Sequence, residues 1–257
     1  MYIKISNVSK TYLDKGREFT ALSEVNLEIA KGEFICLLGP SGCGKSTLLN
    51  AIAGFDPPTR GEILIDGVKV VKPSRRNVTI FQNYGLLPWR NVLRNVELAL
   101  ESRRDIPAAE RRARAQRYLD LVGLRDFADR APHQLSGGMQ QRVAIARALC
   151  AEPEIIFMDE PLGALDALTR MKLQDDIREL QRSQNKTVIF VTHDIEEAVY
   201  LADRVVVMTP NPGKISRILP VELGPGRDRA SQDFFRMKEK ILEVFNLREK
   251  YNIEYAI

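Results

Sequence analysis

A glycine-rich loop, set between an apolar run and a helix-forming run, constrains the fold of this chain more than any other feature. Residues 39–47 read Gly-Pro-Ser-Gly-Cys-Gly-Lys-Ser-Thr and fit the pattern G-x-x-x-x-G-K-[ST]. The apolar run 34–38 precedes the loop, and residues 47–53 favour a helix that Gly54 could cap. In this context the glycines let backbone N–H groups surround phosphate oxygens, and the helix N-terminus adds partial positive charge. The alternative is a glycine-rich turn without function, and the Lys-Ser pair in register argues against it.

The predicted phosphate site consists of nine consecutive residues: Gly39, Pro40, Ser41, Gly42, Cys43, Gly44, Lys45, Ser46 and Thr47. Lys45 is long enough to reach the β- and γ-phosphates of a nucleotide, and the Ser46 hydroxyl is a suitable Mg²⁺ ligand. Because Cys43 lies near the predicted helix N-terminus, we expect the pKa of its thiol to be lowered.

Composition sets broad limits on the kind of protein. Of 257 residues, 44% are hydrophobic, which is enough for one substantial core with room for a subsidiary lobe. The net charge of +4 (38 basic and 34 acidic residues) is mild and gives no signature of nucleic-acid binding. No run approaches the roughly 18 apolar residues of a membrane span, and residues 1–6 lack the apolar core of a signal peptide. Cys36, Cys43 and Cys150 follow no metal-binding spacing, so we expect reduced thiols in a soluble intracellular protein.

Four short apolar runs each end in polar residues, and each run suits a buried parallel strand covered on both faces. The first ends at the glycine loop; the others are 78–81, 155–158 and 187–191, which end at Gln82, at Asp159 with Glu160, and at Thr192 with His193. Ligands of open α/β sheets bind beyond the carboxyl ends of the strands. If the runs are neighbouring strands, these polar residues converge on the loop.

The residues at the strand ends have matching chemistry. Asp159 is suited to hold Mg²⁺, directly or through water, and Glu160 to orient or deprotonate an attacking water. His193 could donate a hydrogen bond to the γ-phosphate, and Gln82 could contact Mg²⁺ or the water. The alternatives are turn or cap roles for the carboxylates and a surface or capping role for His193. The glycine loop favours the functional interpretation.

A second motif, Leu-Ser-Gly-Gly-Met-Gln-Gln-Arg at residues 135–142, precedes a helix-forming run at 143–149. Ser136 is a good N-cap, and Gly137 and Gly138 leave backbone N–H groups uncovered at the helix start. The motif therefore predicts a second anion site without a lysine of its own. An ordinary Ser-Gly-capped helix is the alternative.

A chain with both sites resembles the ABC-type ATPases, whose signature reads LSGGQ; here Met139 stands in place of the Gln. The resemblance spans at least residues 2–208 and includes every expected element in order. It implies an α/β fold with a P-loop NTPase core of mostly parallel strands, an antiparallel β lobe and a helical lobe. The implied domain covers residues 1–230, with the helical lobe at about 88–135, and residues 231–257 form a C-terminal helical extension.

The resemblance also implies a mechanism that uses ATP and Mg²⁺. Two such domains face each other head to tail, and each ATP lies between the phosphate loop of one and the Ser136–Gly138 segment of the other. Asp166 would sit at that interface, and Tyr12 would stack on adenine. Alkylation of Cys43 should then block hydrolysis, and MgATP should protect the thiol.

Residues 85–92, Gly-Leu-Leu-Pro-Trp-Arg-Asn-Val, hold the only tryptophan. In ABC importers the groove after the strand-end glutamine receives a short coupling helix of the membrane subunit, so we expect an exposed docking surface here. The alternative is that Leu86, Leu87 and Trp89 anchor the helical lobe. The sequence of this segment is similar to that found in the nitrate, sulfonate, taurine and bicarbonate importers.

That similarity implies a peripheral subunit at the cytoplasmic face of the inner membrane. Its partners would be integral membrane permease subunits, a second copy of itself or a paralogous ATPase, and indirectly a solute-binding protein. An exporter ATPase, or a non-transport ABC ATPase acting on DNA or ribosomes, is the alternative.

Four further segments have patterns that predict local structure. Residues 62–70 predict a hairpin with an Asp-Gly turn, and residues 204–218 a strand, a turn and a strand. Residues 91–130 are predicted to be mostly helical, and their many arginines alternate with acidic residues, which favours a solvated face over a nucleic-acid patch. The tail from 231 to about 250 predicts an amphipathic helix, in a packing role or as a sensor, whose apolar side carries Phe234, Met237, Ile241, Leu242 and Phe245.

Overall fold

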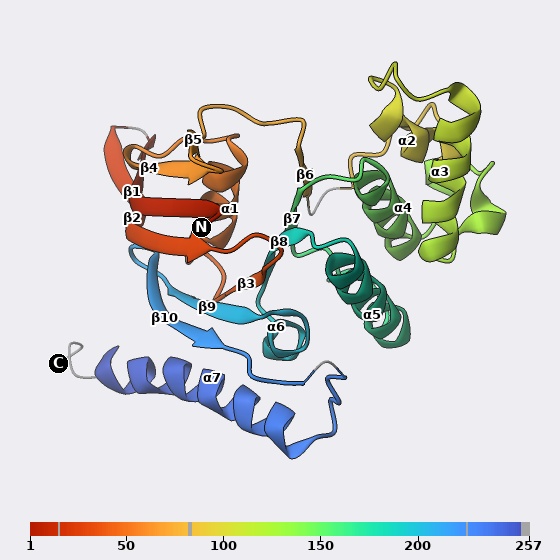
Figure 1. The fold of residues 1–257 in the computed structure, drawn as a ribbon. Coiled ribbons are helices and arrows are strands. Elements are labelled where there is room, and N and C mark those ends of the chain that lie inside the picture. The colour runs from red at the N-terminus through yellow and green to blue at the C-terminus, as the bar shows by residue number, and fades with distance from the viewer. Residues whose placement is uncertain (15, 82–83, 225, 253–257) are drawn as a thin grey trace. The chain divides into compact units, whose positions relative to one another are not determined.

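The computed structural model describes residues 1–14, 16–81, 84–224 and 226–252. Gln82, one of the predicted site residues, lies outside the described residues. The chain divides into two compact units: residues 1–74 together with 187–257 form the first, and residues 75–186 form the second. Figure 1 shows the elements of both units.

The first unit contains an antiparallel sheet in the order β2-β1-β4-β5. Its strands are β1 (Ile3–Asp14), β2 (Arg17–Ile29), β4 (Arg60–Ile65) and β5 (Val68–Lys69). The turn between β4 and β5 has positive φ at both central residues, 52° at Asp66 and 74° at Gly67. This is the backbone conformation for which Asp-Gly is favoured in a two-residue hairpin, and the predicted hairpin is confirmed.

The first unit also contains four neighbouring strands of a second sheet, in the order β10-β9-β3-β8. These strands are β3 (Phe34–Leu38), β8 (Thr187–Thr192), β9 (Arg204–Thr209) and β10 (Lys214–Pro220). β3 runs parallel to β8 and to β9, whereas β9 and β10, which correspond to the predicted strand, turn and strand, pair antiparallel. Every residue of β3 and β8 is buried, as expected of parallel strands that are covered on both faces. Helix α1 (Lys45–Ala53) packs against β8, and α6 (Ile195–Leu201) against β3 and β8.

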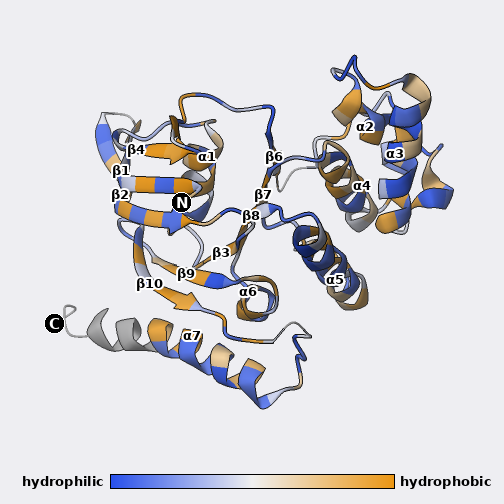
Figure 2. Cartoon of the chain, in the orientation of Figure 1, coloured by the Kyte–Doolittle hydropathy of each residue, from blue (hydrophilic) through white to orange (hydrophobic). Residues whose placement is uncertain are grey.

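Helix α7 (Gln232–Asn252) forms the C-terminal part of the first unit and packs against α6 and β10. Its buried stripe has helical spacing and consists of Phe234, Met237, Ile241 and Val244. The prediction was wrong for Leu242, which is 44% exposed because it follows Ile241 by one residue and turns away from that stripe. Figure 2 shows apolar and polar residues alternating along α7.

The second unit combines a parallel strand pair with a helical group. β6 (Asn77–Ile80) pairs with β7 (Ile155–Asp159), from Asn77 beside Ile155 to Ile80 beside Met158. Helices α2 (Val92–Glu97), α3 (Ala108–Leu121) and α4 (Gly137–Cys150) pack on one another, and α4 also covers β6. The remaining elements are η1 (Leu98–Leu100), η2 (Arg125–Phe127), η3 (Pro132–Gln134) and α5 (Ala167–Ser183). The predicted helical character of residues 91–130 is confirmed.

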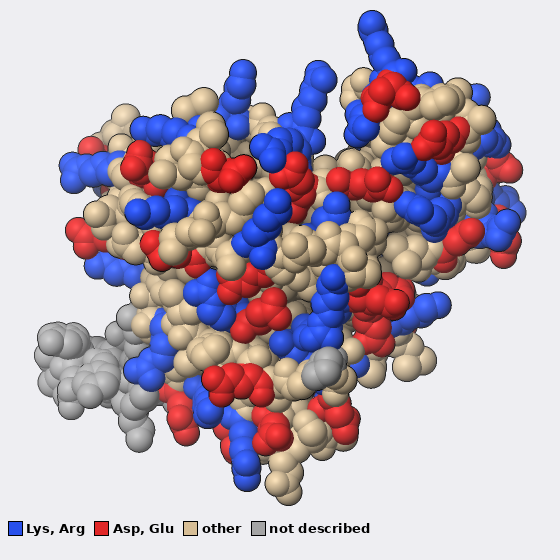
Figure 3. Space-filling model, in the orientation of Figure 1, with Lys and Arg blue, Asp and Glu red and all other residues tan. Residues whose placement is uncertain are grey.

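Several arginines of the helical group are paired with acidic neighbours. Arg103 lies 2.8 Å from Asp105, and Arg114 lies 2.6 Å from Glu110 one turn away. Arg117 pairs with Glu152 at 3.0 Å. Figure 3 shows basic and acidic side chains interspersed over the visible face of the molecule. This pairing supports the interpretation of a solvated, ion-paired surface.

Two glycines with the same backbone conformation provide a stability test. Gly54 ends α1 at φ 83°, and a Cβ there would lie 2.5 Å from the carbonyl carbon of Lys72. Gly67 has φ 74° and no atom within 4 Å of such a Cβ. We expect Gly67→Ala to lower the free energy of unfolding by about 1–2 kcal/mol, the cost of a left-handed conformation, and Gly54→Ala to lower it further. Urea unfolding of both variants measures the difference, and equal losses would contradict the predicted clash.

Candidate nucleotide-binding site

The phosphate loop has a backbone that only glycine accommodates at its close approaches. Gly44 has φ 90° and caps α1, and its carbonyl accepts the Leu48 N–H at 2.8 Å. A Cβ at Gly44 would lie 2.7 Å from Leu22 Cδ2. A Cβ at Gly39 would lie 2.6 Å from both Cys43 Sγ and the Met208 carbonyl oxygen. The glycines of the motif are therefore required by backbone conformation and by packing as well as by any ligand.

Lys45 is buried and folds back along the loop. Its Nζ donates hydrogen bonds to the carbonyl oxygens of Gly39 at 2.7 Å and of Pro40 at 3.0 Å. Ser41, Gly42 and Ser46 are exposed, and Thr47 is half-buried. The loop thus holds a cation against its own backbone at the N-terminus of α1, next to an exposed hydroxyl. This combination of charge and donors suits an anion.

The prediction that Cys43 has a reactive thiol with a lowered pKa was wrong. The Cys43 side chain is fully buried, and burial raises the pKa of its thiol although Lys45 acts in the opposite direction. The helix N-terminus alone would lower the pKa of the thiol, but the desolvation of the thiolate is the larger effect here. Cys36 and Cys150 are also buried and form no disulfide, and burial raises the pKa of Cys150 to about 12.

Tyr12 lies on β1 and is held by a small cluster that the sequence did not indicate. Its hydroxyl donates to Asp56 Oδ2 at 2.5 Å, and Thr47 of the phosphate loop also hydrogen-bonds to Tyr12. Lys10 pairs with the same Asp56, donates to the Pro57 carbonyl at 2.8 Å and lies 5.1 Å from the centre of the Tyr12 ring.

The same cluster shifts the pKa values of its members. Burial and the hydrogen bond with Asp56 raise the pKa of Tyr12. Partial burial opposes ionisation of Asp56, but hydrogen bonds from Lys10 and Tyr12 outweigh it and lower its pKa. Tyr12 is therefore a neutral, 38% exposed ring fixed beside an ionised carboxylate.

His193 follows the strand that pairs with β3. Leu38 of β3 lies beside Thr192 of β8 in the parallel register, so Gly39 and His193 leave the sheet at the same edge. His193 is exposed. Within the first unit, the structure thus brings together the phosphate loop, Tyr12 and the edge that carries His193.

The second unit holds the other predicted residues. Ile80 lies beside Met158, so β7 ends with Asp159 one residue beyond its last paired position. Glu160 follows with φ 46°, an uncommon conformation for a residue with a side chain, and both carboxylates are half-buried. Backbone strain of this kind concentrates at functional sites.

The second motif starts α4 as predicted. The Ser136 hydroxyl accepts the Met139 N–H at 3.3 Å, and Ser136 and Gly137 are exposed. A Cβ at Gly138 would lie 3.2 Å from the Ala164 carbonyl oxygen and from Leu165 Cδ2, so this turn is closely packed. The helix start therefore presents backbone N–H groups at an accessible place.

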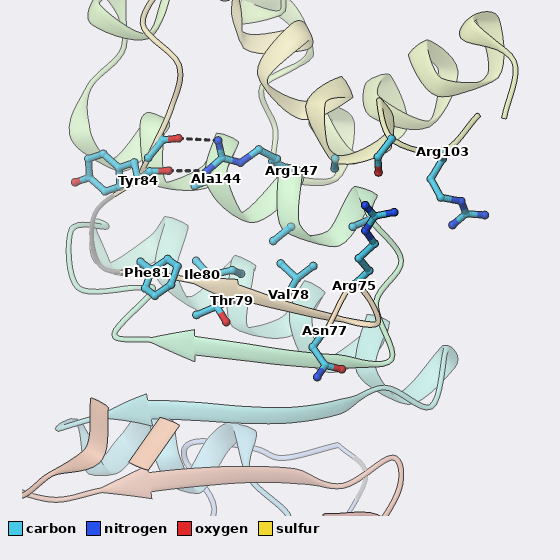
Figure 4. A pocket seen from close by; sticks show the side chains of 15 residues that line it. Arg75, Asn77, Val78, Thr79, Ile80, Phe81, Tyr84, Arg103, Ala144 and Arg147 are labelled. Carbon is cyan, nitrogen blue, oxygen red and sulfur yellow. Dashed lines mark hydrogen bonds between the residues drawn. The ribbon is translucent and has the colours of Figure 1, made fainter. Parts of the chain in front are cut away.

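A pocket of about 400 Å³ lies in the second unit between β6 and the helical group (Figure 4). Its wall includes residues 77–81, Tyr84, Arg75, Arg103 and Arg147. The Arg147 guanidinium donates to the carbonyl oxygens of Tyr84 at 2.9 Å and of Gly85 at 2.8 Å, and burial lowers its pKa. Arg147 thus fixes the chain at the start of the Gly85–Val92 segment.

The Gly85–Val92 segment presents its tryptophan to solvent. Trp89 is 76% exposed, whereas Leu86 and Leu87 are half-buried. Asn95, fully buried, accepts the Leu87 N–H at 2.8 Å and holds the segment on α2. Trp89 is therefore no part of the helical core, while the two leucines contribute to it in part.

Comparisons with known proteins agree on one family. Residues 22–163 match the family described as ABC transporter. The ABC transporter ATP-binding protein MJ0412 of Methanocaldococcus jannaschii is 49% identical over 242 residues, which are 94% of this chain and 90% of that protein. The chain belongs to the ABC transporter family.

Further relatives and solved structures refine this result. The bicarbonate transport ATP-binding protein CmpC of Synechococcus elongatus is 43% identical over 97% of this chain, which spans only 39% of CmpC. The dimeric structure of the ABC transporter cassette MJ0796 superposes with a TM-score of 0.80 at 41% identity, covering 86% of this chain and all of that one. A post-hydrolysis structure of the same cassette with ADP and Pi has a TM-score of 0.80 at 40% identity. The fold is that of an ABC ATPase cassette, and the chain is an ABC-type ATPase that binds nucleotide.

Asp166 has a local role in the structure of this ABC ATPase. It caps α5 by accepting the Thr169 N–H at 3.0 Å, and this backbone hydrogen bond lowers the pKa of its carboxyl group. The side chain is exposed, so capping and a contact with a second chain are compatible.

Asp56 and Lys10 are the clearest residues that sequence reasoning missed. The hydrogen bond of Asp56 with Tyr12 joins positions 44 residues apart, and a lone acidic residue after a helix carries no signal for such a contact. The preceding Gly54 predicted the end of α1, but gave no indication of what the next turn would approach.

The buried Cys43 generates a labelling prediction for this ABC ATPase. Because its pKa is raised, we expect little thiolate at pH 8 and slow alkylation of the folded protein by iodoacetamide, with or without MgATP. In urea, where the chain is unfolded, the same thiol should react about as fast as free glutathione, which is added to the sample as a reference thiol. Peptide mass spectrometry measures the modified fraction. Rapid alkylation of Cys43 in the folded protein would show that the thiol is accessible and ionised.

Proposed function

We propose that this chain is the ATP-hydrolysing subunit of an ABC importer, which dimerises on ATP to drive solute uptake through membrane permease subunits. The observation that carries the importer assignment is the exposed Trp89 in the segment that begins at Gly85, a residue of the pocket wall in the second unit. The solute is a small anion such as nitrate, a sulfonate, taurine or bicarbonate. The similarity to CmpC, a bicarbonate transport protein by name, supports this class.

The proposed nucleotide contacts follow from the chemistry of each residue. The loop residues 39–47 surround the phosphates with backbone N–H groups, and Lys45 exchanges its two carbonyl partners for phosphate oxygens. Tyr12 offers its exposed ring to adenine. In a head-to-tail dimer, Ser136, Gly137 and Gly138 of a second copy provide the other helix start, and Asp166 lies at the same interface.

Mg²⁺ is the cation that suits these residues. Ser46 has an exposed hydroxyl and Asp159 a half-buried carboxylate at a strand end, and both are the hard oxygen ligands that Mg²⁺ prefers. Gln82 is the third proposed ligand and a contact to the attacking water. The bound ion would neutralise charge on the β- and γ-phosphate oxygens.

Glu160 is the proposed catalytic base. Its carboxylate orients a water molecule and accepts its proton as the water oxygen bonds to the γ-phosphorus and the bond to the β-phosphate oxygen breaks. His193 donates a hydrogen bond to the γ-phosphate, which stabilises the charge that develops there. The position of Glu160 directly after the end of β7, together with its constrained backbone, supports this role.

The permease docks, in this proposal, on the Gly85–Val92 segment and the adjoining pocket. Arg75, Arg103 and Arg147 line the pocket beside the apolar residues of β6, so both charge and apolar area are available to a short helix. Among the described helices, none combines the length and apolarity needed to cross a bilayer. We propose a peripheral subunit at the cytoplasmic face of the inner membrane.

Glu160→Gln tests the chemistry. We expect turnover to fall roughly 10²–10⁴-fold, the scale of a general-base contribution, while ATP binding is retained and an ATP-bound dimer accumulates. Phosphate release, nucleotide binding and size-exclusion chromatography with ATP measure the three properties. Glu110→Gln, at an exposed position of α3, is the matched control. Turnover close to the unaltered protein would show that another group is the base.

Trp89→Ala tests the docking surface. We expect the tagged protein, purified from detergent-solubilised membranes of its source cell, to bring a multi-span permease with it, and Trp89→Ala to lose most of that permease. Phe235→Ala, a 62% exposed aromatic on α7, is the matched control. A co-purifying solute-binding protein would establish import. Retention of the permease by Trp89→Ala would place the docking surface elsewhere, and recovery with ribosomal or DNA-repair proteins alone would contradict a transport function.

A further inference from the structure

The turn that carries His193 is fastened to the helix that follows it. The Thr192 hydroxyl donates to Glu197 Oε2 at 2.7 Å, and both side chains are buried. Asp194 caps α6 by accepting the Glu196 N–H at 2.8 Å, and its own N–H donates to the Thr192 hydroxyl at 3.0 Å. His193 therefore lies between a strand end and a helix start that are bonded to each other. Any shift of α6 is transmitted to the His193 turn.

The other end of α6 is held by a buried arginine from the segment that leads to α7. Arg227 donates from Nη1 to the carbonyl oxygens of Val199 at 2.7 Å and of Tyr200 at 2.9 Å, and its side chain is 2% exposed. α6 has only seven residues, so these two carbonyls belong to its unsatisfied last turn. A guanidinium at this place satisfies them and favours the negative end of the helix.

Arg227 also meets the strand that leads into the phosphate loop. Its Nη2 lies 3.8 Å from Asp203 Oδ1. The other oxygen of Asp203 accepts the Phe34 N–H at 2.9 Å, and the Asp203 N–H donates to the Phe34 carbonyl at 2.7 Å. Phe34 begins β3, whose last residue precedes Gly39. One buried cation thus joins the end of α6 to the start of β3.

Helix α7 reinforces the same arrangement at the start of α6. Lys238 Nζ pairs with Glu196 Oε2 at 2.9 Å, in the first turn of α6. Arg229 lies with its guanidinium 3.4 Å from the centre of the Tyr200 ring, at the other end. The segment from Arg227 to Lys238 therefore contacts both ends of α6 through its charged groups. Helix α7 also packs against α6.

From this geometry we infer that Arg227 is a positioning residue for ATP hydrolysis, which holds α6 and with it the His193 turn at the edge where β3 delivers the phosphate loop. The inference rests on the proposed role of His193 at the γ-phosphate. It gives the C-terminal segment a function in turnover beyond packing. Lys238 is an auxiliary contact, because its ion pair with Glu196 is more exposed than the site of Arg227.

Arg227→Met tests this inference, because methionine fills a similar space without the donors. We expect kcat per nucleotide-binding site to fall at least about tenfold while the Kd for ATP changes less than about twofold, since an interaction made only in the transition state appears in kcat. Arg227→Lys should recover part of the loss. Arg217→Met, at an exposed position of β10, is the matched control and should retain full kcat. Sites are counted by bound fluorescent nucleotide, so a partly unfolded sample does not imitate the effect.

Three further variants separate the possible outcomes. If His193→Ala lowers kcat and Arg227→Met leaves kcat per site unchanged, the inference is overturned while the proposed function stands. If His193→Ala has full kcat, the proposed role of His193 fails and the inference fails with it. If Arg227→Met does not fold, the comparison of Lys238→Met with Lys240→Met, on the same helix, tests the inference. We expect kcat to fall about two- to fivefold in Lys238→Met and to stay unchanged in Lys240→Met. Equal kcat for these two variants overturns the inference.

Discussion

The parallel register of β3 with β8 is the constraint on which the first unit depends. It pairs Leu38 with Thr192, so the phosphate loop and the His193 turn leave the sheet at one edge. The register is fixed because every side chain of both strands is buried, and a slip by one residue would exchange their two faces. The loop then closes over Lys45 because its glycines allow backbone conformations that bring carbonyl oxygens to the ammonium. The packing of the sheet thus determines where the loop and the His193 turn lie.

Elements with strong local signals could be predicted from sequence. The apolar runs at 34–38, 155–158 and 187–191 became β3, β7 and β8, and the first and last of these run parallel to each other as expected. Ser136 caps α4 and Gly54 ends α1, because a hydroxyl or a glycine at a helix end acts on atoms within four residues. The Asp-Gly turn between β4 and β5 could also be predicted, because its conformation depends on the two residues of the turn themselves. The family, too, could be recognised from motifs that are contiguous in sequence.

Features set by distant residues could not be predicted. The Cys43 thiol was expected to be acidic from its neighbours in the chain, but its side chain is fully buried in the folded protein, and burial raises its pKa. Leu242 was assigned to the apolar side of α7 from its residue type, and only the packing of α7 on α6 and β10 shows which positions face inward. Asp56 contacts Tyr12 across 44 residues, and no local pattern marks the pair. Each of these outcomes is a desolvation or contact effect that requires the folded chain.

Buried and exposed charged side chains have different structural roles in this molecule. The ion pairs of the helical group lie at the surface, where solvent and salt screen them, and they leave the fold insensitive to any one of them. Arg227 and Lys45 are buried, and each directs its donors to backbone carbonyls at the end of an element or within a loop. Without those partners a buried cation is strongly unfavourable, so its position and that of the surrounding backbone are mutually fixed. Lys45 differs from Arg227 because its partners lie in a loop with exposed residues, where an incoming anion can compete for the ammonium. The cost of burying a cation therefore makes Arg227 a structural tie, and it supports the proposal that Lys45 exchanges its carbonyl partners for phosphate oxygens.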